Sequence, residues 1–169
     1  GNDNGPGMKS INDAGASSNN VLIEYNDISH TTDFICSNGD NFLARNNVFG
    51  PSVVTDFGGT PHVDGWQANA QTRYGFMEAN WHVDNSVSDS HMILIEAPVS
   101  GANGHFAVVR NVSLRSGDHL WFQMRDGDNL HAAHNSVGQI GFGPRGGPGS
   151  SGFFYVWSEN TPSNGNFSL

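Results

Sequence analysis

The hexapeptide Val-Leu-Ile-Glu-Tyr-Asn at residues 21–26 decides the fold, because its outline recurs along the chain. The further copies are Phe-Leu-Ala-Arg-Asn-Asn at 42–47, Gly-Phe-Met-Glu-Ala-Asn at 75–80, Phe-Ala-Val-Val-Arg-Asn at 106–111 and Leu-His-Ala-Ala-His-Asn at 130–135. Apolar residues at alternate positions are typical of a β-strand with one buried face. The copies therefore predict a series of equivalent strands, each ending on asparagine.

A second run of residues with strand character follows each of these strands and makes the unit a two-part repeat. The second runs begin about 30 residues apart, at Asp33, His62, His91, His119 and Gly152. A strand, a turn, a second strand and a loop recur at a nearly fixed period, and no helical periodicity appears between them. This arrangement predicts a solenoid whose coils stack in parallel.

The composition favours an all-β chain and limits its partners. Charged residues make up only 14% of the 169 residues, and the 22 glycines disfavour helices because glycine loses much backbone entropy. A formal net charge of -9 with seven lysines and arginines argues against nucleic acid or an anionic membrane surface as partner. The single cysteine, Cys36, excludes an internal disulfide. No apolar run approaches the roughly 18 residues of a membrane span.

Stacking places equivalent positions of successive coils above one another, so alternate positions can be read as columns. In the first strand, two columns are expected to face the core: Val21, Phe42, Gly75, Phe106 and Leu130, then Ile23, Ala44, Met77, Val108 and Ala132. In the second strand, the expected core columns are Phe34, Val63, Met92, Leu120 and Phe153, then Cys36, Gly65, Leu94, Phe122 and Tyr155. The terminal asparagines are expected to form a ladder of amides, and Glu24, Arg45 and Glu78 an outer stack of alternating charge.

The asparagine-ended strands resemble those of the right-handed parallel β-helix proteins of the pectate-lyase-like superfamily, above all in residues 21–28 and 41–49. The resemblance implies one all-β domain over residues 1–169, a right-handed parallel β-helix of about five to six coils with an asparagine ladder. Residues 1–20 are then a loop or incomplete first coil, 21–160 the coils and 161–169 a tail. No amphipathic helix caps an end, so further coils or self-association are expected there.

The stretch Pro-His-Val-Asp-Gly-Trp-Gln-Ala-Asn at residues 61–69 concentrates chemistry within one coil. Positions that alternate with the predicted core columns are expected to face outward, where the insertions 48–61 and 137–151 would wall a groove. The candidate catalytic residues on this face are His62, Asp64, His91 and Arg125. The candidate substrate-binding residues are Trp66, His119, Trp121 and Gln123, and no metal site is expected from the ligand spacing.

These residue types suit a carbohydrate, because indole rings stack on sugar rings while imidazole, carboxylate and amide groups bond to hydroxyls. A lyase needs a base and a cation, for which His62 or His91 with Arg125 or a bound calcium ion are candidates. A hydrolase needs two carboxylates, and Asp64 with Asp56 or Glu96 is the available set. We therefore expect an extracellular or cell-surface β-helix that binds and cleaves a polysaccharide. The alternative is a non-catalytic structural or adhesive β-helix, such as part of a fibre or tailspike.

Overall fold

The computed structural model contains only β-strands as regular elements in the part of the chain that it describes. The described residues are 9–12, 19–31, 33–37, 39–52, 63–68, 72–83, 90–96, 105–113, 122–125, 129–137, 154–157 and 167–168. No helix long and apolar enough to cross a membrane occurs among them. The prediction of an all-β chain is confirmed for these residues.

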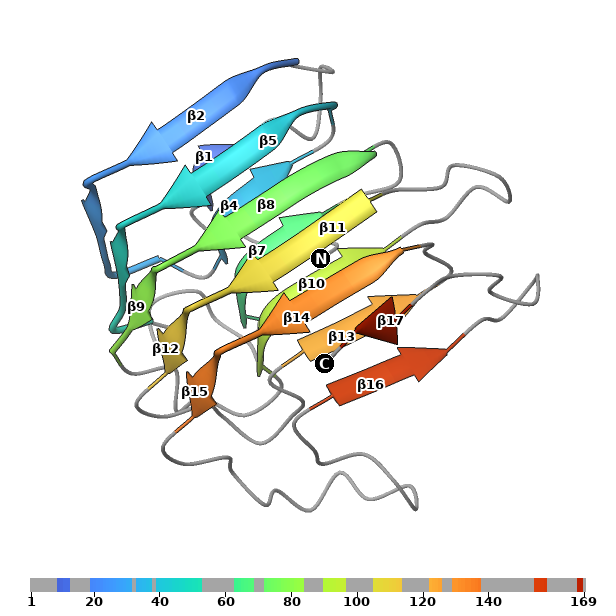
Figure 1. Cartoon of the computed structure of the whole chain (residues 1–169). Helices are drawn as coiled ribbons and strands as arrows, with labels where there is room; N and C mark the ends of the chain where they lie inside the picture. The colour runs from blue at the N-terminus through green and yellow to red at the C-terminus, as the bar shows by residue number, and fades with distance from the viewer. Residues whose placement is uncertain are drawn as a thin grey trace.

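The strands form three parallel sheets, which we call sheets A, B and C (Figure 1). Sheet A contains β1 (Lys9–Asn12), β4 (Asp33–Ser37), β7 (Val63–Ala68), β10 (Ser90–Glu96), β13 (Phe122–Arg125) and β16 (Phe154–Trp157). Sheet B contains β2 (Val21–Glu24), β5 (Phe42–Arg45), β8 (Tyr74–Glu78), β11 (His105–Val109), β14 (Leu130–Ala133) and β17 (Phe167–Ser168). Sheet C contains β3 (Asp27–Ile28), β6 (Val48–Phe49), β9 (Trp81–His82), β12 (Val112–Ser113) and β15 (Ser136–Val137).

The chain visits the three sheets in rotation, and each return to a sheet adds the next strand beside the previous one. Sheet C was not predicted from the sequence. Each of its strands is only two residues long and begins directly after a ladder asparagine, so it is too short to show an alternating pattern. The repeating unit therefore has three strands rather than two.

The register of sheet B agrees with both predicted core columns of the first strand. Val21 pairs with Phe42, Phe42 with Gly75, Gly75 with Phe106, and Phe106 with Leu130. The second column is equally continuous, and its described side chains are buried: Ile23, Ala44, Met77, Val108 and Ala132. The inward face of sheet B was thus readable from period-two alternation.

Sheet A departs from the predicted pattern, because residues at both alternations are buried. All five residues of β4 and residues 64–68 of β7 are inaccessible to solvent. The column formed by Ile35, Trp66 and Ile93 was predicted to face outward, but it belongs to the hydrophobic core. Strands covered on both sides carry apolar residues in continuous runs, and alternation alone cannot choose the inner face of such strands.

Trp66 shows which way this column points. Its indole crosses from sheet A to sheet B, where it stacks on Phe42 at a centroid distance of 5.3 Å and meets Phe106 edge-on at 6.1 Å. A Cβ atom at Gly75 would lie 2.3 Å from Cη2 of Trp66. Glycine occupies this place in an otherwise bulky column because the indole fills the space of its missing side chain.

The predicted asparagine ladder is present and runs along the turns between sheets B and C. Asn26, Asn47, Asn80 and Asn111 each donate from the backbone N–H and from Nδ2 to Oδ1 of the next asparagine, at 2.9–3.2 Å, and the series ends at Asn135. The left-handed backbone belongs to the residue before each ladder asparagine: Tyr25, Asn46, Ala79, Arg110 and His134. The ladder amides hold a turn that these residues enter with positive φ.

Candidate functional site

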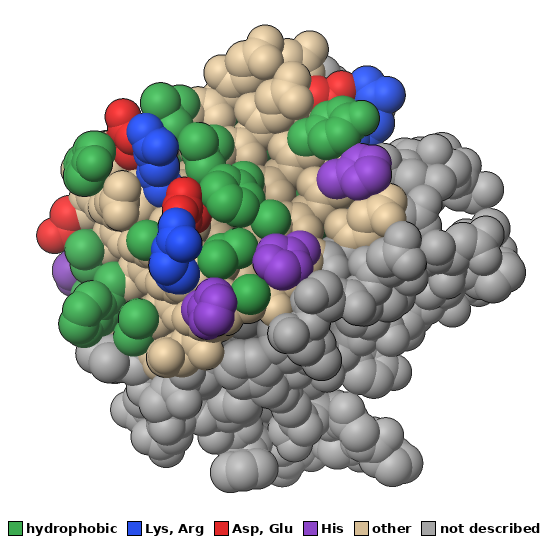
Figure 2. Space-filling view, viewed as in Figure 1, with side chains coloured by type: hydrophobic (Ala, Val, Ile, Leu, Met, Phe, Trp, Pro, Cys, Tyr) green, Lys and Arg blue, Asp and Glu red, His purple; other side chains and the backbone are tan. Residues whose placement is uncertain are grey.

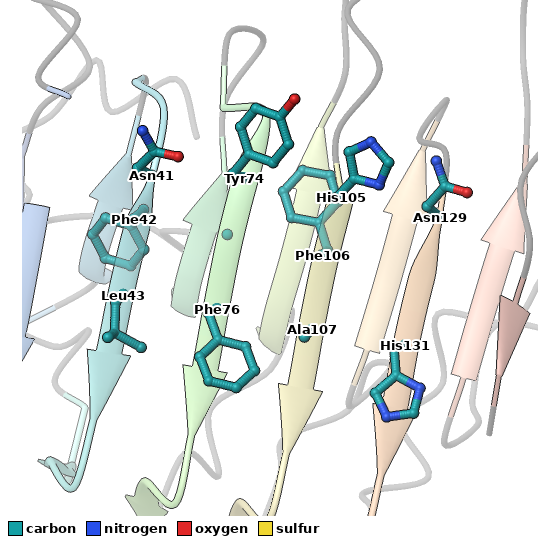
Figure 3. Close-up of a pocket in the computed structure, with 11 residues that line it drawn as sticks. Asn41, Phe42, Leu43, Tyr74, Phe76, His105, Phe106, Ala107, Asn129 and His131 are labelled. Atoms are coloured by element: carbon teal, nitrogen blue, oxygen red, sulfur yellow. The ribbon is translucent and has the colours of Figure 1, made fainter. Parts of the chain in front are cut away.

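An open groove of about 630 Å³ lies on the outer face of sheet B, opposite the face that covers the core. Its volume falls within the range of ordinary ligand sites. The described residues that line it come from β5, β8, β11 and β14 and from the residues before them (Figure 3): Asn41, Phe42, Leu43, Tyr74, Gly75, Phe76, His105, Phe106, Ala107, Asn129 and His131. The groove thus crosses four neighbouring strands.

One side of the groove is a row of polar and aromatic side chains at the start of each strand. Asn41, Tyr74, His105 and Asn129 follow one another across the sheet in Figure 3. Tyr74 and His105 pair in register, and their rings stack at 5.3 Å with an interplanar angle of 5°. Tyr74 is 49% exposed. Together the row offers a phenol, an imidazole and two amides to a ligand.

The other side is a row of mostly apolar side chains two residues further along each strand. Leu43, Phe76, Ala107 and His131 are consecutive register partners in sheet B. Leu43, Phe76 and Ala107 are half-buried, whereas His131 is exposed. We call these two sets the polar row and the apolar row. Between them lies the backbone around Phe42, Gly75 and Phe106, whose inward side belongs to the core.

Charged side chains border the groove as matched pairs. Beyond the apolar row, Arg45 Nε donates to Glu24 Oε2 at 2.7 Å, and Arg110 pairs with Glu78. Figure 2 shows acidic and basic side chains alternating in a line on this face, beside hydrophobic side chains and histidines. The predicted charge stack of Glu24, Arg45 and Glu78 is therefore confirmed. Arg110 extends it by one residue.

A further ion pair lies on the polar side of the groove, one residue before Asn41 and Tyr74. Arg73 Nε donates to Asp40 Oδ1 at 2.9 Å, and its Nη2 donates to Oδ2. The hydrogen bonds from Arg73 hold the pKa of the Asp40 carboxyl below its usual range, so this carboxylate is ionised and compensated. None of the described lining residues is Asp, Glu, Lys or Arg. The groove is thus bordered by charge but lined by neutral aromatic, aliphatic and amide groups together with two imidazoles.

The sequence placed the site on another face, and two of its residues lie in the interior. Asp64 and Trp66 are each 0% exposed, so the prediction that they face outward is wrong. Trp66 cannot present a face to a sugar ring, because Phe42 and Phe106 cover it and its Nε1 donates to Ser37 Oγ at 2.9 Å. The backbone N–H of Asp64 donates to Asp33 Oδ1 at 3.1 Å, which ties β7 to β4.

The other predicted residues are placed only by their backbone or lie outside the described residues. His91 is the register partner of Asp64, whereas the sequence aligned it with His62. Gln123 pairs with Leu94, and Arg125 pairs with Glu96. His62, His119 and Trp121, Asp56 and most of the insertions 48–61 and 137–151 are outside the described residues. Their proposed roles remain predictions.

The residues of the groove were missed, although the sequence contained a signal for them. Leu22, Leu43 and Phe76 occupy the outward alternation of the asparagine-ended strands, where a solvated surface would favour polar side chains. Leu22 is 53% exposed and continues the apolar row onto β2. An apolar residue at the same outward position in successive copies indicates a binding face more directly than a concentration of catalytic residue types.

One histidine is buried beneath sheet C rather than available to a ligand. His82 is fully enclosed beside Phe49, at a ring-centroid distance of 5.1 Å. Burial lowers the pKa of His82 to about 3 because the charged imidazolium would lose its hydration. No described residue makes a hydrogen bond to either ring nitrogen. His82 is therefore neutral in the folded protein near pH 7.

The fold and the groove together define a class: in its described residues the protein is all-β, with three parallel sheets and an open groove on the outer face of one of them. No protein-family model, curated protein or solved structure matches the chain. Within the described residues, no group of three or more histidine, cysteine, aspartate or glutamate side chains is placed to hold a metal ion.

Proposed function

We propose that the protein is a right-handed parallel β-helix of the pectate-lyase-like kind that binds a polysaccharide in the groove on sheet B. The rotation of the chain through three parallel sheets supports the β-helix, since each turn of a solenoid adds one strand to every sheet. The continuous asparagine ladder supports it as well, because such a ladder needs equivalent turns stacked directly on one another.

The observation that carries the proposed ligand is the pairing of a polar row with an apolar row along one open groove. A sugar ring has an apolar face and a rim of hydroxyl groups, so it matches a site with apolar side chains on one side and hydrogen-bonding groups on the other. Phe76 and Leu43 supply the first, while Asn41, Tyr74 and His105 supply the second. A polysaccharide ligand fits an extracellular or cell-surface location.

At this groove we propose binding rather than hydrolysis. Glycoside hydrolysis ordinarily uses two carboxyl groups that flank the bond to be cleaved, and the described lining residues include none. Cleavage by residues of the second strand, including His62, His91 and Arg125, is a separate proposal for a different face. The two proposals can be told apart by mutagenesis: substitutions in the groove should reduce binding, whereas substitutions at His62, His91 or Arg125 should reduce the release of cleavage products.

The test is a panel of soluble polysaccharides, neutral and acidic, screened by affinity electrophoresis and then by calorimetry. Phe76→Ala and Tyr74→Ala are each expected to weaken binding about tenfold, the loss of one aromatic contact. Trp81→Ala is the matched control, because Trp81 is also 49% exposed but lies on sheet C.

Failure of the wild-type protein to bind any polysaccharide would overturn the proposal and favour the structural or adhesive alternative. If Trp81→Ala loses binding while Phe76→Ala binds normally, the binding site lies on sheet C and not in the groove on sheet B. Reducing ends and unsaturated sugars measured in the same samples, with His62→Ala as comparison, test cleavage independently of binding.

A further inference from the structure

We infer that the ligand is a neutral, unbranched polysaccharide whose chain runs across the strands of sheet B, with about one sugar unit over each strand. The inference rests on the proposed function and deepens it. It concerns the charge of the sugar, the direction of its chain and the shortest piece that fills the site. None of these follows from carbohydrate binding alone.

The direction follows from the shape of the space between the two rows. The rows stand two residues apart on each strand, which is about 7 Å, whereas each row extends over four strands, about 14 Å between its end residues. The groove is therefore long across the strands and short along them. An extended polymer gains contacts only by lying between the rows, from Leu43 on β5 to His131 on β14.

The length of the ligand follows from the strand spacing. Neighbouring strands lie about 4.8 Å apart, which is close to the advance of one sugar unit in an extended linear chain. Successive units then meet Leu43, Phe76, Ala107 and His131 in turn, each opposite one member of the polar row. A side branch over the middle of the groove would meet the stacked rings of Tyr74 and His105, so an unbranched chain fits best.

The neutrality of the ligand follows from the charges that border the groove. Arg45, Arg73 and Arg110 are engaged by Glu24, Asp40 and Glu78 respectively. A uronic acid would have to compete with these carboxylates for any of the three arginines that the structure describes beside the groove, and the chain as a whole carries a formal net charge of -9. Neutral hydroxyls instead find the phenol and amide groups of the polar row.

The experiment is calorimetry on two series of purified oligosaccharides. The neutral series are β-1,4-linked gluco- and xylo-oligosaccharides and β-1,3-linked gluco-oligosaccharides of two to six units, and the acidic series is oligogalacturonides of the same lengths. For a neutral series that binds, affinity is expected to rise about three- to tenfold with each unit up to about four units and then to level off. Oligogalacturonides are expected to bind at least about tenfold more weakly.

Two variants at opposite ends of the apolar row test the direction of the chain. Leu43→Ala and His131→Ala should each weaken the binding of a tetrasaccharide about three- to tenfold. A single ligand loses affinity in both variants only if its chain crosses the strands and contacts both positions. Val48→Ala, a substitution at an exposed position of sheet C, is the control and should leave affinity unchanged.

The outcomes separate this inference from the proposed function. Affinity that levels off at two units, tighter binding of oligogalacturonides, or sensitivity to only one end of the row overturns the inference while the groove remains a carbohydrate site. Absence of binding to every oligosaccharide, together with a negative polysaccharide panel, overturns both.

Discussion

Replacing Asn80 by alanine is expected to be among the most damaging single substitutions in this chain. Asn80 is buried in the middle of the asparagine ladder. Its Nδ2 donates to the carbonyl of Ala44 and to Oδ1 of Asn111, both at 3.0 Å, and its Oδ1 accepts from the N–H and Nδ2 of Asn47 at 3.0 and 2.9 Å. The alanine variant loses all four bonds and leaves their partners enclosed.

The cost can be worked from these contacts. A net contribution of about 1 kcal/mol for each hydrogen bond gives about 4 kcal/mol, and unsatisfied buried partners raise rather than lower the figure. Single domains are stabilised by about 5–15 kcal/mol, so Asn80→Ala should remove a large fraction of the stability. Asn80→Asp should be similarly damaging, because a carboxylate oxygen would replace the amide that now donates to Ala44 and Asn111.

The assay is urea unfolding followed by circular dichroism, with Asn26→Ala as the matched control. Asn26 belongs to the same ladder but is exposed, and its Nδ2 donates to Glu24 O at 2.9 Å and to Asn47 Oδ1 at 3.2 Å. Water replaces these partners after substitution, so its cost should stay below about 1 kcal/mol. If the free energies of unfolding of Asn80→Ala and Asn26→Ala agree within about 1 kcal/mol, the ladder does not stabilise the fold as argued.

Three further substitutions probe the core, the buried imidazole and the turns. Gly75→Ala should lower the free energy of unfolding by about 1–3 kcal/mol, because the added Cβ meets the indole of Trp66. The loss should be smaller when Trp66 is also replaced by leucine, and equal losses in the two backgrounds would contradict this contact. The folded pKa of His82 is about 3, against 6.5 for the ordinary side chain, so between these values the unfolded state alone takes up the proton and stability falls as pH falls. From pH 7.5 to pH 5 the free energy of unfolding falls by about 2 kcal/mol for this reason. In urea titrations at the two pH values, His82→Leu should abolish this pH-dependent loss. Phe49→Leu should lower the stability at both pH values and leave the difference between them unchanged. Ala79→Gly should raise the free energy of unfolding by about 0.5–1 kcal/mol in thermal unfolding, because Ala79 has a φ of 52°, and a decrease would show that the turn is not strained there.

The sequence predicted sheet B well because its strands carry two independent signals. Alternation distinguishes Ile23 and Met77, which face the core, from their less buried neighbours, and the terminal asparagine fixes the register of every copy. A strand with one covered face and a marked end is the case in which periodicity is most informative. The register of sheet B followed, and so did the charge stack from Glu24 to Glu78.

Sheet A was predicted less well because its strands lack both signals. His91 was aligned with His62, whereas it pairs with Asp64, two residues further along. A slip of two residues preserves the face on which a side chain lies, so the register did not cause the error for Trp66. The error came from assigning only the alternation of Phe34 to the core, whereas Phe34 and Ile35 both belong to the buried core cluster. The large side chain of Trp66 and the missing side chain of Gly75 together indicate that Trp66 points toward sheet B. This complementarity can be recognised only once it is known that the two residues face each other.

The inward direction of the Trp66 side chain also explains why the groove lies on sheet B. An indole that reaches from β7 to Phe42 and Phe106 fixes the inward side of those residues, and alternation then sends Leu43, Phe76 and Ala107 outward. From β5 to β14, each return of the chain to this sheet adds one residue to the polar row and one to the apolar row. A face made in this way repeats with the fold itself, which is why the ligand we propose is a polymer with a repeat close to the strand spacing of about 4.8 Å. A small compact ligand would contact only a fraction of a surface that extends over four strands.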